Sequence, residues 1–459
     1  METIFLEKWL HSKIREEATA NQEFRQFLGG RTLKTLTRAH VENYQLFKLR
    51  KMLSCVHERS SFYRELFDRN SIKPGQIQSL QDLGNLPFTD PADFAKNPNH
   101  FLCVSHGEVA RVTTFTTSGT TGPQKRVFCT KADLERITDF MGVGMRTVTH
   151  SGDVVQIMLP SGSVNNQAEL LARGVEKIGG LPVIAGLNKS ADEQLELIRR
   201  HKPVVIFAVT PAIYRMTQEL LRRCPLHELG VRTLFLSSGY LSEPMREHLK
   251  NVWQCDVHDH YGLTEMGLGV AVECHAHNGY HFNEADLLLE MVNPKTGQVV
   301  TEGEGELVFT TLTRQGTPLI RYRTHDIARL VTQPCPCGAA TLLKFGKVTK
   351  RVELLVAVGD DDVIYPSLFD DVLYKLPEVV DYNLIVSRAD ARDKLDFVVE
   401  VTEMNGSLRE RIFDLLAEEP VIKANLRTGT MSKPGVTIMG LGEFSRTGRA
   451  KKKIRDNRK

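Results

Sequence analysis

The chain has 459 residues, of which 41% are hydrophobic and 25% are charged, and its formal net charge is +3. These values are typical of a soluble globular protein, and the length allows two or three domains. A charge this close to zero provides no electrostatic basis for binding nucleic acid or an anionic membrane surface. No apolar run has the length of a membrane span, and the first residues do not resemble a signal peptide. We therefore expect a cytoplasmic protein whose eight cysteines are free thiols or metal ligands rather than disulfides.

The first hundred residues are predicted to be largely helical. Leu49, Met52, Leu53 and Val56 recur at the spacing of one helix face, whereas their charged neighbours point elsewhere. A turn at Pro74-Gly75 interrupts this helical region.

The segment 116–125 has the sequence TTSGTTGPQK, in which glycines and hydroxyl side chains are followed by Lys125. Glycines let backbone N–H groups approach a polyanion, hydroxyls add donors, and lysine supplies a positive charge. The composition therefore predicts a phosphate-binding loop. A Walker-type loop is excluded because no Gly-Lys-Ser/Thr opens a helix here. The alternative is a flexible surface turn.

Short apolar runs alternate with amphipathic segments after this loop. Strands are predicted at 154–159, 182–185, 204–209 and 233–236, and helices at 169–178, 195–200 and 212–223. Buried strands that alternate with helices indicate an α/β fold with a mainly parallel sheet.

The pattern changes again beyond residue 280, where alternating strands are separated by Gly-rich turns. We place a domain boundary near Gly346, which divides the chain into a large domain, 1–345, and a small one, 346–459. The small domain is predicted to be α+β, with strands at 382–386, 395–401 and 436–439 and a helix at 408–416.

Three further motifs follow the phosphate loop in order: YGLTE at 261–265, RYRTHD at 321–326 and FGK at 345–347. In order and spacing the four motifs resemble those of the acyl-adenylate-forming, or AMP-binding, ligases. More specifically, the chain resembles the phenylacetate–CoA ligase branch, and this resemblance extends almost from end to end of the chain. It implies a large adenylating domain with mixed and parallel sheets, followed by a small mobile α+β domain.

The resemblance also implies an activity. A carboxylate, by default an aromatic one in this branch, attacks the α-phosphorus of ATP, expels pyrophosphate and is then transferred to coenzyme A. The implied cofactors are ATP, Mg²⁺ and coenzyme A, and a homodimer is the branch expectation. Two alternatives remain open, namely transfer to a carrier protein or an amine, and a non-catalytic nucleotide-binding protein.

Residue roles can be carried over only onto the matching positions. The loop that ends at Lys125 would hold the β,γ-phosphates, and its matching residues are Thr117, Ser118, Gly119, Thr120, Thr121 and Gly122. Glu265 would hold Mg²⁺, a hard cation that prefers oxygen ligands, and Thr264 would donate to the α-phosphate.

The remaining matches concern adenine and ribose. Tyr261, next to Gly262, would stack on adenine, and Asp259 would accept a hydrogen bond from its amino group. Asp326 would take both ribose hydroxyls. A turn beside the adenine and acyl pocket would contain Ser238, Gly239 and Tyr240.

The chain departs from the family pattern near its hinge and its C-terminus. Lys347 replaces an arginine expected to grip ribose and phosphate, and Thr349 replaces a charged hinge residue. The catalytic lysine of the family aligns with Arg449, and Lys451 follows closely. Either Arg449 or Lys451 would supply the cation for adenylation, unless that step has been lost.

A separate group of residues has the donor set of a structural zinc site. Cys335 and Cys337 form a tight CPC knuckle, and Cys274 and His281 lie in one upstream segment. Three sulfurs and one imidazole would complete a tetrahedral site. Buried free cysteines are the alternative, because these spacings are not diagnostic.

Overall fold

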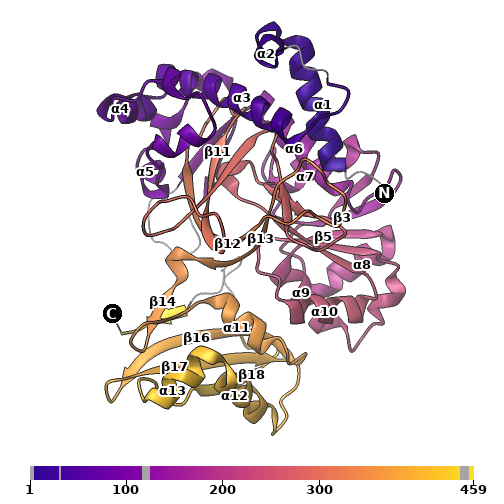
Figure 1. Cartoon of the computed structure of the whole chain (residues 1–459). Helices are drawn as coiled ribbons and strands as arrows, with labels where there is room; N and C mark the ends of the chain where they lie inside the picture. Colours follow the sequence, from indigo (N-terminus) through magenta and orange to yellow (C-terminus); the bar gives the residue numbers. More distant parts are fainter. Residues whose placement is uncertain (1–4, 30–32, 116–124, 445–453, 459) are drawn as a thin grey trace. The chain divides into compact units, whose positions relative to one another are not determined.

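The computed structural model describes residues 5–29, 33–115, 125–444 and 454–458. These form a mixed α/β fold with a large sheet of parallel and antiparallel strands, which confirms the predicted fold class (Figure 1). The chain divides into two compact units. Unit 1 comprises Met1–Ile184 and His258–Lys347, and unit 2 comprises Ala185–Val257 and Val348–Lys459.

Unit 1 contains the N-terminal helices and most of the antiparallel strands. Its helices are α1 (Phe5–Ala20), α2 (Gln22–Phe27), α3 (Arg38–Arg59), α4 (Ser61–Arg69), α5 (Pro91–Lys96), α6 (Lys131–Met145) and α7 (Gln167–Lys177). Its strands are β1 (Val109–Phe115), β2 (Lys125–Thr130), β3 (Val154–Met158), β4 (Leu181–Ile184), β8 (Ala271–Glu273), β9 (Tyr280–Phe282), β10 (Leu287–Val292), β11 (Glu304–Thr311) and β12 (Tyr322–Val331). The assignment changes from one unit to the other within β7 (Asp256–Tyr261) and β13 (Lys344–Arg351).

The strand pairing in unit 1 brings distant motifs onto neighbouring strands. β7, β8 and β9 pair antiparallel, and β9 then pairs antiparallel with β13. β10, β11 and β12 form an antiparallel meander, whereas β3 and β4 are parallel. This arrangement ties the segment after β7 to β12 and β13, which carry the later motifs.

The N-terminal helices cover unit 1 through an apolar face and a set of buried polar contacts. The four apolar residues predicted for one helix face all lie buried on α3. Towards the start of this helix, Tyr44 donates a hydrogen bond to Ala285 O at 3.1 Å, and Gln45 donates to Leu287 O at 3.4 Å. These bonds attach α3 to the start of β10.

Unit 2 combines a parallel strand pair with the C-terminal α+β region. Its helices are α8 (Ala191–His201), α9 (Thr210–Leu220), α10 (Glu243–Trp253), α11 (Pro366–Leu373), α12 (Leu408–Glu418) and α13 (Pro420–Thr428). Its strands are β5 (Val205–Val209), β6 (Thr233–Ser237), β14 (Val356–Val358), β15 (Asp362–Ile364), β16 (Val379–Ala389), β17 (Arg392–Val401), β18 (Gly435–Gly440) and β19 (Ile454–Asp456). β5 and β6 are parallel, and the C-terminal sheet has the order β18-β17-β16-β19.

Every strand and helix predicted between residues 154 and 236 is present, with ends shifted by a few residues. The C-terminal strands and helix are also confirmed, but β19, α11 and α13 were not predicted. Short elements of this kind show too few periods for a pattern to be recognised. Within the described residues, no helix is both long and apolar enough to cross a membrane.

Candidate functional site

Three buried side chains from distant motifs meet in unit 1. Lys125 begins β2, Glu265 lies on the short 3-10 helix η6 (Thr264–Met266), and Tyr322 begins β12. Lys125 Nζ lies 3.0 Å from Glu265 Oε1 and donates to Tyr322 Oη at 2.9 Å. The Tyr322 hydroxyl donates to the same Glu265 oxygen at 2.8 Å. None of the three residues is more than 4% exposed.

The sequence predicted Lys125 and Glu265 as site residues without predicting that they touch. Removing both charges from water is costly, and their mutual attraction and the tyrosine hydroxyl offset that cost. Both described hydrogen bonds of Glu265 reach Oε1. Within the described residues, its second oxygen therefore has no hydrogen bond.

The C-terminal end of β7 carries Asp259 and Tyr261, whose side chains are also hydrogen bonded. The Tyr280 hydroxyl donates to Asp259 Oδ2 at 2.5 Å, and the Tyr261 hydroxyl donates to Asp326 Oδ2 at 2.7 Å. Asp259 and Asp326 are both buried. The structure thus brings together the predicted adenine residue Tyr261 and the predicted ribose residue Asp326.

Gly262 follows Tyr261 at a point where the chain approaches itself closely. A Cβ atom added here would lie 2.3 Å from the carbonyl oxygen of Leu268. Glycine is therefore required at this position for steric reasons. Thr264 is half-buried at the start of η6, two residues further along.

Several predicted residues lie outside this cluster. Thr117, Ser118, Gly119, Thr120, Thr121, Gly122 and Arg449 fall outside the described residues, and so does Lys451. Lys347 lies half-buried on β13. The contact between the phosphate loop and the rest of the site is therefore described only at its last residue, Lys125.

The predicted turn after β6 belongs to unit 2. Ser238 adopts a left-handed backbone conformation with φ of 62°, and a Cβ atom on Gly239 would lie 2.8 Å from Pro211. The Tyr240 hydroxyl donates to Asp371 Oδ2 on α11 at 2.9 Å. Burial and the negative charge of Asp371 both raise the pKa of Tyr240, so this hydroxyl stays protonated.

The predicted zinc ligands also come together in unit 1. The ligand atoms of Cys274, His281, Cys335 and Cys337 all lie within 4.8 Å of one another, and all four residues are buried. Cys274 Sγ lies 3.5 Å from Cys335 Sγ, and Cys337 Sγ lies 3.5 Å from His281 Nε2. This compact donor set fits a tetrahedral metal ion of the zinc type.

The environment of His281 favours the form that binds metal. Burial lowers the pKa of His281 to about 4, so the imidazole is neutral at pH 7. Its Nδ1 lies 3.2 Å from Leu343 O and can donate to that carbonyl, which leaves Nε2 as the acceptor that faces the thiols.

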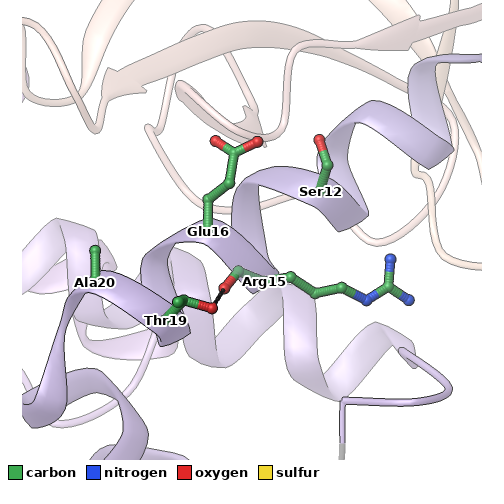
Figure 2. Close-up of a pocket in the computed structure, with 5 residues that line it drawn as sticks. All are labelled: Ser12, Arg15, Glu16, Thr19 and Ala20. Atoms are coloured by element: carbon green, nitrogen blue, oxygen red, sulfur yellow. Dashed lines mark hydrogen bonds between the residues drawn. The ribbon is translucent and has the colours of Figure 1, made fainter.

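A shallow hollow lies on α1, apart from these residues. Figure 2 shows its lining, which comes from one helix: Ser12, Arg15, Glu16, Thr19 and Ala20. The Thr19 hydroxyl donates to Arg15 O at 2.8 Å, so this side chain is already satisfied. The hollow contains no predicted site residue, and its mixed charges indicate no particular ligand.

Comparison with known proteins gives two family matches along the chain. The model of the AMP-binding enzyme family matches residues 76–312, just over half of the chain. The chain belongs to the AMP-binding enzyme family. A second model, the AMP-binding enzyme C-terminal domain, matches residues 362–458.

Curated relatives of this AMP-binding enzyme match over most of their length. A phenylacetate-coenzyme A ligase of Thermus thermophilus is 32% identical over 407 residues, which are 86% of this chain and 88% of the relative. The enzyme of the same name from Aromatoleum evansii is 30% identical over 384 residues, which are 82% and 85% of the two chains. A solved 2-hydroxyisobutyryl-CoA ligase has the same fold, with a TM-score of 0.78 at 17% identity over 93% of this chain and 91% of that one.

In this AMP-binding enzyme, three residues that hydrogen bond to predicted site residues were not predicted from the sequence. Tyr322 lies inside the RYRTHD motif but had no assigned role, and Tyr280 and Asp371 lie outside every motif. The only sequence signal was the position of Tyr322 inside that motif. The pairing of the other two residues depends on strand and helix packing.

Proposed function

We propose that this chain is an ATP-dependent, AMP-forming ligase that activates a carboxylic acid as its acyl adenylate and transfers the acyl group to coenzyme A. Family membership and the named relatives support this assignment. The observation that carries it in the structure is the buried contact of Lys125 with Glu265. Lys125 ends the loop that we propose holds phosphate, and Glu265 is the residue that we propose holds the metal.

Each residue has a proposed task in adenylation. Attack of one anion on another requires charge neutralisation and alignment of the reacting atoms. Lys125 supplies positive charge at the end of the phosphate loop, and Tyr322 holds it against Glu265. Glu265 would hold Mg²⁺, which supplies charge neutralisation at the phosphates. Four further residues would bind the nucleotide. Tyr261 would stack on adenine, and Asp259 would accept from its amino group. Asp326 would bind the ribose, and Thr264 would donate to the α-phosphate.

We propose an aromatic acid as the substrate class. The support is that four curated relatives are phenylacetate-coenzyme A ligases. The proposed domain boundary lies after residue 345, and the second family match begins downstream of it, at residue 362.

Pyrophosphate release tests this function directly. The purified chain, ATP and Mg²⁺ are mixed with a panel of aromatic and aliphatic acids, first without and then with coenzyme A. We expect acid-dependent pyrophosphate release and, with coenzyme A, formation of a thioester. Adenylate formation with no thioester would instead favour a carrier protein or an amine as acceptor. No pyrophosphate with any acid would favour the non-catalytic alternative.

We also propose that Cys274, His281, Cys335 and Cys337 bind one structural Zn²⁺. The compact, buried donor set supports this site, and a reducing compartment such as the cytoplasm would keep the thiols available. Structural zinc contributes directly to folding free energy. Cys335→Ser should therefore lose the metal and melt at a lower temperature, whereas Cys224→Ser, at a buried cysteine outside the cluster, should keep it. Metal analysis of protein purified without chelators would contradict the proposal if it found no zinc.

The oligomeric state is a separate proposal. We propose a homodimer, as the resemblance implies, and sedimentation of the purified chain would test it. A single species with the mass of one chain would contradict it.

A further inference from the structure

Lys344 is a buried lysine at the start of β13, and the proposed mechanism does not use it. Only 4% of its surface is exposed. Its Nζ is buried and has no hydrogen-bond partner among the described residues. A buried ammonium without a partner is strongly unfavourable, so the position calls for an explanation.

Strand pairing places Lys344 beside the cysteine and histidine cluster. β13 and β9 are antiparallel, and Lys344 is directly opposite His281. Side chains of directly opposed residues extend from the same face of a sheet, with Cβ atoms about 5 Å apart. Lys344 and the proposed ligand His281 are therefore neighbours on adjacent strands.

Two buried acids of unit 1, Glu7 and Glu284, are hydrogen bonded to groups other than Lys344. Glu7 Oε1 accepts hydrogen bonds from Ala340 N at 2.9 Å and from Thr341 N at 2.6 Å. Glu284 is bonded by Arg38 and by Leu343 N. Neither carboxylate accepts a hydrogen bond from Lys344 Nζ, so the N–H groups of this ammonium are left without an acceptor among the described residues.

A metal-loaded cysteine and histidine cluster would provide a negative counter-charge for Lys344. A divalent ion with three thiolates and one neutral imidazole carries one net negative charge. With protonated thiols and no metal, the same cluster is neutral. The unpaired ammonium and the anionic metal–thiolate centre are thus complementary in charge, and they are neighbours in the sheet.

We propose that Lys344 is the counter-cation of the metal–thiolate site, where its ammonium balances the charge and donates to thiolate sulfur. This inference rests on the proposed zinc site. Lys344 is a positioning residue rather than a metal ligand. Because it begins β13, the strand that continues to Gly346 and Lys347, metal binding would also fix the start of that strand.

The test measures metal affinity and stability in the full-length chain. Lys344→Met removes the charge and retains most of the side-chain volume, Lys344→Arg retains the charge, and Lys295→Met is a control at an exposed lysine of unit 1. Zn²⁺ affinity is measured by competition with a chelator, and Co²⁺ spectra report on the thiolate ligands. Melting temperatures are recorded with and without metal.

We expect Lys344→Met to have opposite effects on the metal-bound and the metal-free chain. Lys344→Met should weaken Zn²⁺ binding by about tenfold to a hundredfold, as loss of an outer-shell partner does. Without metal, the same variant should melt at the same or a higher temperature, because a buried unpaired charge has been removed. Lys344→Arg should bind more tightly than Lys344→Met, and Lys295→Met should match the parent.

Three results would overturn the inference in different ways. If the parent chain binds no metal, the zinc proposal fails and the role of Lys344 fails with it. If the parent binds one metal ion and Lys344→Met binds it equally well, only the role of Lys344 fails. Equal destabilisation of the loaded and metal-free forms would likewise assign Lys344 to packing alone.

Discussion

Lys125 Nζ and Glu265 Oε1 are 3.0 Å apart, although 140 residues separate them in the sequence. Their side chains are only 6% and 3% exposed, so the pair is held in a low-dielectric environment. The contact fixes the start of β2, directly after the predicted phosphate loop, against η6. Loss of either charge would leave the other buried and uncompensated.

Glu265→Gln should therefore affect both catalysis and stability. We expect acid-dependent pyrophosphate release to fall by roughly a hundredfold or more, as loss of one electrostatic contact in the transition state does. The melting temperature should also fall, because Lys125 loses its counter-charge. Rates are compared at a temperature where circular dichroism shows the variant folded, and a near-normal rate there would remove Glu265 from the site.

Tyr322→Phe is the matched comparison. It retains the Lys125–Glu265 ion pair but removes the hydroxyl that bonds to both residues. We expect a smaller decrease in pyrophosphate release than for Glu265→Gln, of about tenfold or less. An equal decrease in the two variants would mean that positioning of Lys125, rather than the charge of Glu265, limits the reaction.

Gly262→Ala should disrupt the segment between β7 and η6. The added methyl group would lie 2.3 Å from Leu268 O, which is backbone and cannot rotate away. We expect a stability loss of about 1–3 kcal/mol and weaker ATP binding, measured by denaturant unfolding and calorimetry. Gly406→Ala serves as the control, because a Cβ atom there meets nothing within 4 Å. Parental ATP affinity in Gly262→Ala would show that this segment does not shape the nucleotide site.

Arg38→Met should produce a pH-dependent loss of stability. Burial raises the pKa of Glu284 and Arg38 opposes that rise, so the variant raises the pKa further. The unfolded-state pKa of a glutamate is about 4.3. When the folded-state pKa lies above this value, folding stability falls as the pH rises from the unfolded-state pKa through the folded-state pKa. The unfolding free energy of Arg38→Met should therefore lie only slightly below that of the parent chain near pH 4 and about 3–5 kcal/mol below it at pH 8.

The exposed partner of Arg38 provides a control for this pH dependence. Glu42 also pairs with Arg38, but its side chain is 50% exposed. Glu42→Gln should change the unfolding free energy by less than about 0.5 kcal/mol at either pH. A pH-independent loss in Arg38→Met would show that Glu284 does not depend on this cation.

The C-terminal cation is tested by separating the two half-reactions. We expect either Arg449→Ala or Lys451→Ala, but not both, to slow pyrophosphate release by roughly two to three orders of magnitude. Arg449 is the favoured residue because it follows Gly448 directly and a guanidinium can meet an oxyanion in bidentate fashion. The same variant should convert pre-formed acyl adenylate and coenzyme A at close to the parental rate. Normal adenylation in both folded variants would exclude a catalytic role for this tail.

Local sequence information was sufficient for the fold class and for those elements that show a clear hydrophobic period. The apolar periodicity around Leu49 and Val56 correctly predicted α3, and alternating runs predicted β3 to β6 and α7 to α9. The YGLTE and RYRTHD motifs made Glu265 and Asp326 candidate site residues, because glycines, hydroxyls and acids at fixed spacing are local features. Short elements such as β19 escaped this reasoning, since three residues do not establish a period.

Only the tertiary structure decided which chemical groups meet. The sequence named Lys125 and Glu265 separately, but their contact, and the part of Tyr322 in it, follows from packing between distant segments. The spacing of Cys335 and Cys337 suggested metal, while the antiparallel register of β9 and β13 set Lys344 opposite His281. Motifs are encoded in neighbouring residues, whereas burial and charge pairing arise from strand register and long-range packing, which no single segment of the chain contains.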